Sequence, residues 1–173
     1  MSRHLPLVVV AGLTIATFAP PDLSACGDKF LLVGRSLRFK QAFASAHPSS
    51  IVAYAPAGSR VRDLMKEQGF AALLAFAGHD VRIVDGPEAL AKALAGRRVD
   101  LVLAELQNGP DLQRGLAQER SRPLLAPIVF NAPKSATASI ERQYGCAIRM
   151  PARAVEALAA VEEAIKLHDQ QTK

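Results

Sequence analysis

Short apolar runs alternate with stretches of helical periodicity between residues 50 and 168. Five of these runs have the length and the flanking turn residues of parallel strands, which are apolar on both faces because helices cover both sides of the sheet. The predicted strands span residues 51–55, 81–84, 101–104, 128–130 and 145–148. The segments between them carry apolar residues at helical spacing, so each strand is expected to lead into a helix.

Helix-start signals support this alternation. Ser59 is a favourable N-cap for a helix whose apolar positions extend to Leu74. A second helix is predicted over residues 87–95, with proline at its first position, where the missing N–H costs nothing. Pro151 begins a final amphipathic helix that ends near His168.

Alternating strands and helices build a parallel sheet covered on both faces, and right-handed crossovers restrict how such units are wound. We therefore predict an α/β domain over residues 50–168, a doubly wound, three-layer parallel sheet of five strands. Residues 26–49 form an N-terminal extension outside the repeat. Within it, residues 30–34 are a candidate edge strand and residues 37–46 a candidate short helix. Residues 169–173 are a C-terminal tail.

The first 25 residues have the pattern of an export signal. Arg3 and His4 precede an apolar run over residues 5–19, and small residues lead up to Cys26. The apolar run is about 15 residues long, shorter than the roughly 20 that a helix needs to cross a bilayer. We predict that residues 1–25 are a signal peptide that is removed. The domain is then periplasmic or secreted in a bacterium.

The residues at this cleavage site leave two fates open for Cys26. The sequence LSAC resembles a lipobox, in which Cys26 is lipidated and anchors a membrane lipoprotein, but it also suits an ordinary signal peptidase that cuts after Ala25. With a free thiol, Cys26 can form a disulfide with Cys146, the second of the two cysteines. With an acylated Cys26, Cys146 is a lone buried thiol. The cysteines and histidines lack metal-binding spacing, so no metal site is expected.

Charge narrows the choice of partner. The chain has 21 Lys and Arg residues against 16 Asp and Glu residues, a net charge of +5, and loss of the signal peptide removes one charge of each sign. The basic positions are scattered and lack interleaved aromatic residues for stacking on bases, so nucleic acid is not expected as a partner. A protein partner in the cell envelope or an anionic membrane surface suits this charge better. The glycines form no phosphate-binding motif, so no cofactor is expected.

Residues 50–168 resemble a response-regulator receiver domain. Residues 100–106 (DLVLAEL) are similar to the strand that carries the phosphoacceptor aspartate, and residues 126–132 (APIVFNA) are similar to the fourth strand. Met150 and Pro151, followed by the apolar positions of the last helix, are similar to the exit from the fifth strand. The resemblance implies the flavodoxin-like fold with strand order 2-1-3-4-5.

The resemblance also implies a phosphorylation site at the carboxyl ends of the strands, but this chain departs from it at four places. Tyr54 and its two successors stand where an acidic pair would help to hold Mg²⁺. Glu105 replaces the phosphoacceptor aspartate, Asn131 replaces a serine or threonine, and Met150 replaces a lysine. We therefore expect no phosphotransfer by this domain.

In open parallel sheets, ligands bind outside the carboxyl ends of the strands. The residues expected to line such a crevice are Tyr54, Pro56, Asp85, Glu105, Asn131 and Met150. No Ser or Cys nucleophile motif accompanies the histidines, so no enzymatic activity is expected. The expected function is a non-catalytic, receiver-like interaction module that binds a protein partner in the cell envelope through a helix face or this crevice. The alternative is a small-ligand binding protein, or a minor hydrolase, that uses the same crevice.

Overall fold

A computed structural model describes residues 44–172 of the chain. The predicted signal peptide, Cys26 and the candidate edge strand at residues 30–34 lie outside the described residues. Residues 44–46, the described end of the short helix expected over residues 37–46, are not helical. No helix within residues 44–172 combines the length and apolar content that a membrane span requires.

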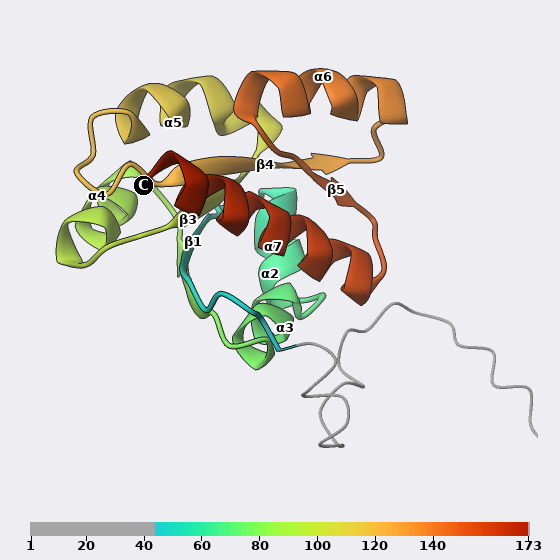
Figure 1. Ribbon diagram of the computed structural model, residues 1–173, viewed down its shortest axis with the longest axis horizontal. Coiled ribbons are helices and arrows are strands. Elements are labelled where there is room, and N and C mark those ends of the chain that lie inside the picture. The colour runs from blue at the N-terminus through green and yellow to red at the C-terminus, as the bar shows by residue number, and fades with distance from the viewer. Residues whose placement is uncertain (1–43, 173) are drawn as a thin grey trace, which may run out of the picture.

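Five parallel strands form one sheet in the order β2-β1-β3-β4-β5 (Figure 1). This confirms the predicted fold class and strand order, and the arrangement is compatible with a flavodoxin-like fold. The strands are β1 Ser50–Tyr54, β2 Asp80–Val84, β3 Leu101–Glu105, β4 Leu124–Phe130 and β5 Ile148–Met150. The first four residues of β3 are all buried, as expected for a central strand covered on both faces.

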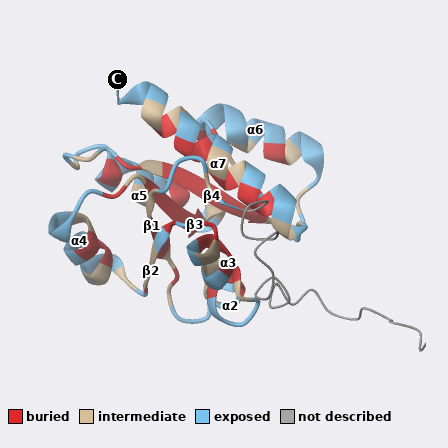
Figure 2. Cartoon of the chain, turned by 60° about the horizontal axis from the view of Figure 1, so that its bottom comes forward, coloured by how far each residue is buried: buried red, intermediate tan, exposed pale blue. Residues whose placement is uncertain are grey.

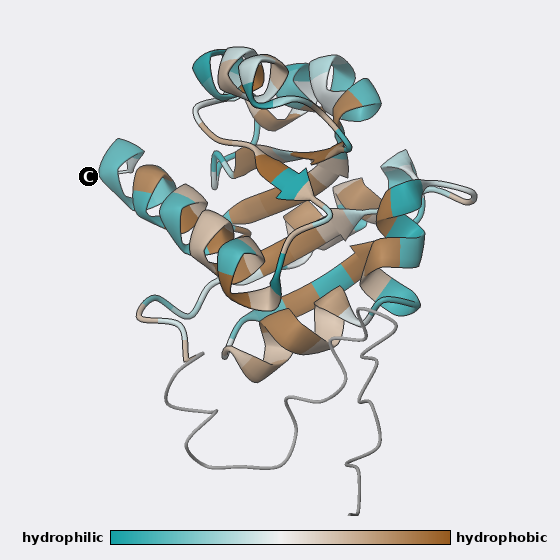
Figure 3. Cartoon of the chain, turned by 90° about the vertical axis from the view of Figure 1, so that its right-hand side faces the viewer, coloured by the Kyte–Doolittle hydropathy of each residue, from teal (hydrophilic) through white to brown (hydrophobic). Residues whose placement is uncertain are grey.

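Helices cover both faces of the sheet, which gives the three layers seen in Figures 1 and 3. The first face packs against α2, α3 and α7, and the second face packs against α4, α5 and α6. The α-helices are α2 Arg60–Lys66, α3 Phe70–Phe76, α4 Pro87–Gly96, α5 Gly109–Leu116, α6 Lys134–Tyr144 and α7 Ala154–Gln171. A short 3-10 helix, η2 Leu106–Asn108, links β3 to α5.

Two hydrophobic clusters, one on each side of the sheet, form the core. Successive side chains of a strand point to opposite faces, so Ile51 and Ala53 join the cluster under α2, α3 and α7, whereas Val52 joins the cluster under α4 and α5. Leu103 and Ala104 of β3 divide in the same way. Figure 2 shows the result: buried residues fill the sheet and the inner sides of the helices, and exposed residues face outward.

The single helix predicted after β1 is instead two helices. Ser59 caps α2 as predicted, because its hydroxyl accepts the backbone N–H of Arg62 at 3.2 Å. The helix then ends at Lys66, and Gly69 adopts a left-handed conformation with φ of 74°. Glycine populates this region readily, so the chain turns sharply here and α3 starts in a new direction at Phe70.

Two boundaries near the C-terminus also differ from the prediction. Gly145 is not in β5: with φ of 83° it ends α6, and its N–H donates to the carbonyl of Glu141 at 2.8 Å. The strand consequently starts three residues later than predicted, at Ile148. The last helix starts at Ala154 rather than Pro151, where the Glu156 carboxylate accepts the backbone N–H of Arg153 at 3.2 Å, and its helical residues include 169–171 of the predicted tail.

The left-handed Gly145 provides a test of this boundary. A Cβ added at Gly145 meets no atom within 4 Å, so Gly145→Ala should lower the free energy of unfolding by about 1 kcal/mol through backbone strain alone. A Cβ at Gly115 inside α5 also meets no atom within 4 Å, and Gly115→Ala should raise the free energy of unfolding by up to about 1 kcal/mol. Urea denaturation measures both changes. Equal stability of Gly145→Ala and the wild type would contradict the capping role.

Candidate functional site

The guanidinium group of Arg62 lies between the loops that follow β1 and β2. Arg62 Nε donates to the carbonyl oxygens of Ala55 at 3.1 Å and Pro56 at 3.2 Å. Arg62 Nη2 lies 3.9 Å from Asp85 Oδ2. Because the Asp85 carboxylate is 73% exposed, this ion pair stabilises the fold little. The part of the predicted crevice formed by Pro56 and Asp85 therefore contains a cation of the protein itself.

The carboxyl ends of β4 and β5 form a small separate pocket. Asn131 follows β4 with φ of 54°, and its N–H donates to the carbonyl of Met150 at 2.8 Å. The guanidinium of Arg60 lies 4.1 Å from the centre of the Phe130 ring, a cation–π contact. These four residues line a pocket of about 270 Å³.

The structure divides the predicted crevice into several sites. Asn131 and Met150 share the small pocket, whereas Pro56 and Asp85 meet at Arg62. Glu105, at the end of β3, accepts a hydrogen bond from Gln107 Nε2 at 3.3 Å. Tyr54, the remaining member of the set, lines a different and larger space on the second face of the sheet.

This space is a groove of about 430 Å³ between α4 and α5, which we call the α4–α5 groove. Its walls are mostly apolar side chains from the facing sides of the two helices. They are Pro87, Leu90, Ala91 and Leu94 of α4 and Leu112 and Leu116 of α5; Gly115 and the charged Asp111, also on α5, complete the walls. Tyr54 and Asn108 lie at the end nearest the carboxyl ends of β1 and β3, and Glu119 lines the other end.

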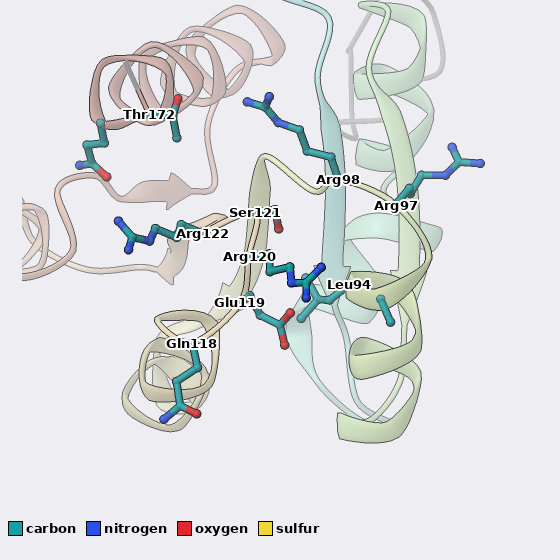
Figure 4. Close-up of a pocket in the computed structure, with 11 residues that line it drawn as sticks. Leu94, Arg97, Arg98, Gln118, Glu119, Arg120, Ser121, Arg122 and Thr172 are labelled. Atoms are coloured by element: carbon teal, nitrogen blue, oxygen red, sulfur yellow. The ribbon is translucent and has the colours of Figure 1, made fainter.

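A second, larger space of about 940 Å³ lies at the amino-terminal ends of β3 and β4 (Figure 4). Three separate parts of the chain surround it: the end of α4 with the loop into β3, the turn after α5, and the end of α7. The charged lining residues are Arg97, Arg98, Arg120, Arg122 and Glu119. We call this space the arginine cavity. Leu94 and Glu119 line both the α4–α5 groove and the arginine cavity, so the two spaces adjoin.

Two of the four arginines have carboxylate partners outside the lining of the cavity. Arg97 Nη1 lies 2.6 Å from Asp80 Oδ2, and Arg98 Nε lies 2.9 Å from Asp100 Oδ1. Within residues 44–172, Arg120 and Arg122 make no ion pair with any acidic side chain. The cavity therefore has an excess of positive charge that the described part of the chain does not neutralise.

Sequence analysis missed this cavity because the basic residues are scattered along the chain. A usable signal was nevertheless present: Arg97 and Arg98 shortly precede β3, and Arg120 and Arg122 shortly precede β4. Strands β3 and β4 are neighbours in the predicted order. Because parallel strands begin at the same edge of a sheet, residues preceding neighbouring strands lie close together in space.

The three histidines among the described residues line neither space. The His79 side chain is fully buried, with Nε2 3.7 Å from Glu162 Oε1, and the His47 Nδ1 atom lies 3.8 Å from Glu162 Oε2. Both ring nitrogens of His79 lack a hydrogen-bond partner among the described residues. His168, on α7, is also buried. No three His, Cys, Asp or Glu side chains in residues 44–172 are placed to hold a metal ion.

Cys146 is buried beside β4, with Sγ 3.9 Å from the carbonyl oxygen of Leu125. Burial, with a smaller contribution from the negative charge of Glu141, raises the pKa of Cys146 to about 11. The thiol is therefore protonated at neutral pH and is a poor nucleophile. Its expected disulfide partner, Cys26, lies outside the described residues, so the disulfide stays a prediction.

Comparison with known proteins gives no family for this chain: no protein-family model and no curated protein sequence matches it. The fold alone does not decide between functions, because sheets of this kind carry many different sites. The function therefore has to be inferred from the groove, the cavity and the strand ends.

The buried His79 makes the stability of the domain sensitive to mild acid. Burial lowers the pKa of His79 below 6.5, and the Glu162 charge raises it by a smaller amount. The unfolded chain binds a proton that the folded chain excludes. The contribution of His79 to the free energy of unfolding is therefore fully present above pH 6.5 and decreases as the pH falls below 6.5. One such proton changes the free energy of unfolding by at most about 1.4 kcal/mol per pH unit.

Urea denaturation between pH 6.5 and 5 measures this slope, which should be smaller in His79→Asn than in the wild type. Glu156, whose pKa is lowered mainly by its hydrogen bond with the Arg153 side chain, is present in both proteins and therefore does not change the comparison. Identical slopes in the two proteins would contradict the role of His79.

Proposed function

We propose that the domain is a non-catalytic, receiver-like interaction module of the bacterial cell envelope, and that it binds a protein partner through the α4–α5 groove. The observation that carries the proposal is the groove, a concave and mostly apolar space of about 430 Å³. Its volume and chemistry are those of binding sites, which are typically concave, apolar and about 300–1,000 Å³ in size. Export to the envelope rests on the sequence pattern of residues 1–25.

A groove is the favoured contact surface because the convex surface offers little apolar area. Among the described residues, Val155 is the one large apolar side chain that is exposed, at 61%. Broad docking faces need contiguous apolar patches. The apolar side chains of a partner therefore insert between α4 and α5, as in complexes where a helix or extended segment occupies a groove between helices.

The contacts at the strand ends support a module without phosphotransfer. Mg²⁺ binding requires several oxygen ligands, and Arg62 holds a positive charge against the carbonyl groups of Ala55 and Pro56, where the ion would need its carboxylates. This charge repels a divalent cation. Glu105 accepts the hydrogen bond from Gln107 and lacks the lysine and hydroxyl partners of a phosphorylated receiver.

A small ligand in the α4–α5 groove is the second candidate. Tyr54 and Asn108 lie at one end of a mostly apolar lining, which also includes the charged residues Asp111 and Glu119. A few polar groups beside apolar surface can fix the orientation of a small molecule. A ligand that remains bound to the purified protein in native mass spectrometry, and that is absent from a groove-filling variant, would favour this candidate over the protein partner.

The absence of phosphotransfer is tested by incubation with acetyl phosphate and Mg²⁺. The intact mass of the protein should stay unchanged, because neither Asp100 nor Glu105 has the environment of a phosphoacceptor. Asp100 accepts the backbone N–H of Ser50 at 2.9 Å and pairs with Arg98. A gain of one phosphoryl group on either residue would refute the non-catalytic assignment.

The role of the groove is tested by filling it. Gly115→Leu places a side chain in the groove without displacing any atom near the Cβ, and it replaces a helical glycine, so the fold should be at least as stable as the wild type. The partner captured by in-cell crosslinking should be recovered at least about tenfold less with Gly115→Leu, since tenfold corresponds to a loss of only about 1.4 kcal/mol.

Ala159→Leu is the matched control, because Ala159 is an exposed residue of α7 on the opposite face of the sheet. The control should capture the same partner as the wild type. Equal recovery of that partner by Gly115→Leu would refute binding through the groove, and thermal unfolding of both variants checks that the fold is intact.

A further inference from the structure

We propose that the arginine cavity binds the carboxylate side chains of an acidic protein segment. This inference rests on the proposed function, because the same segment places its apolar side chains in the adjoining α4–α5 groove. The recognised partner is thus an amphipathic segment with apolar residues at one end and Asp or Glu residues at the other. Three properties of the cavity lead to this assignment: its charge, its backbone geometry and its position.

The charge of the cavity favours an anionic guest. Four arginines and a single acidic residue, Glu119, line it. Asp80 and Asp100 each engage one nitrogen of Arg97 or Arg98. A guanidinium carries five N–H donors in a planar fork, so donors remain on both arginines for a second acceptor. Carboxylates match that fork with two parallel hydrogen bonds.

The backbone at Arg122 is costly for an ordinary turn residue. Its φ of 43° lies in the left-handed region, which is unfavourable for any residue with a Cβ. The turn is closed by the Arg122 N–H, which donates to the carbonyl of Glu119 at 3.1 Å. Glycine or asparagine would form this turn with less strain. An arginine here is consistent with a function of the side chain beyond the turn itself.

The position of the cavity favours a peptide over a membrane surface. The arginines come from two separate segments (Figure 4), and a guest group can enter the space between them. A side-chain carboxylate can do so, whereas a plane of lipid headgroups meets only the rim.

The dimensions limit the length of the segment. Helix α4, which forms one wall of the groove, has ten residues and is therefore about 15 Å long. A helical partner segment of about ten residues matches this length, and an extended segment needs about five. Its acidic end lies toward Arg120 and Arg122, and its apolar end lies toward Tyr54.

N-acetyl hexaglutamate is a suitable probe of the cavity, because it carries the proposed carboxylates without the apolar end. Titrated into the ¹⁵N-labelled full-length protein, it should shift the backbone amide signals of Arg98, Ser121 and Arg122. Binding should weaken as salt is added, since exposed charges are screened. The double variant Arg120→Gln/Arg122→Gln should bind at least about tenfold more weakly, which corresponds to about 1.4 kcal/mol.

Arg142→Gln/Arg149→Gln is the control for net charge, because both residues are exposed and neither lines the arginine cavity. It should bind hexaglutamate as the wild type does. Equal weakening in the two double variants would overturn the inference, because attraction to overall charge would then explain the binding. Cosedimentation with phosphatidylglycerol vesicles that needs Arg120 and Arg122, without hexaglutamate binding, would also overturn it in favour of a membrane surface.

Gly115→Leu separates this inference from the proposed function. The variant fills the groove and leaves the cavity open, so it should bind hexaglutamate normally. If hexaglutamate binds as described but Gly115→Leu captures the partner normally, the groove assignment fails and the anion site stands. If partner capture depends on Gly115 but hexaglutamate does not bind, the cavity assignment fails.

Discussion

The complete burial of the central residues of β1 and of most of β3 is the constraint on which the rest of this structure depends. Ile51, Val52 and Ala53 of β1 are fully inaccessible to solvent, as are the first four residues of β3. Their side chains point to both faces of the sheet, so both faces need a covering layer. The backbone groups of these strands are satisfied within the parallel ladder. Burial of β1 and β3 thus requires a helical layer on each side of the sheet.

The α4–α5 groove follows from how the second layer is connected. Helix α4 leads from β2, at one edge, to β3, whereas α5 leads from β3 to β4 on the other side. Both crossovers run in the same direction across the sheet, so the two helices cover neighbouring parts of the same face. Leu90 and Leu116 are buried in the core beneath the groove, whereas the outer parts of α4 and α5 are separated by it. The need to cover this face of the sheet with two helices thus also produces the α4–α5 groove.

The sequence allowed the fold to be predicted better than the site. Apolar runs such as residues 101–104 are local signals, and β3 occurs where expected. Glycine at positions 69 and 145 has no local signature of its left-handed conformation. The break between α2 and α3 was therefore not predicted, and the start of β5 was placed too early. The candidate crevice was inferred from residue types at strand ends, but the course of the Arg62 side chain, which crosses back over the chain, depends on tertiary contacts. The arginine cavity required strand order as well as sequence.

The contacts before β1 have a consequence for how the domain is oriented in its surroundings. The Ser45 N–H donates to the carbonyl of Ala77 at the end of α3, and His47 lies beside Glu162 on α7. The chain therefore enters the domain on the face covered by α3 and α7. An attachment through earlier residues would turn this face toward the anchor, and the α4–α5 groove, on the opposite face, would point outward. Under such an attachment, the entry point of the chain would set which face of the domain is presented.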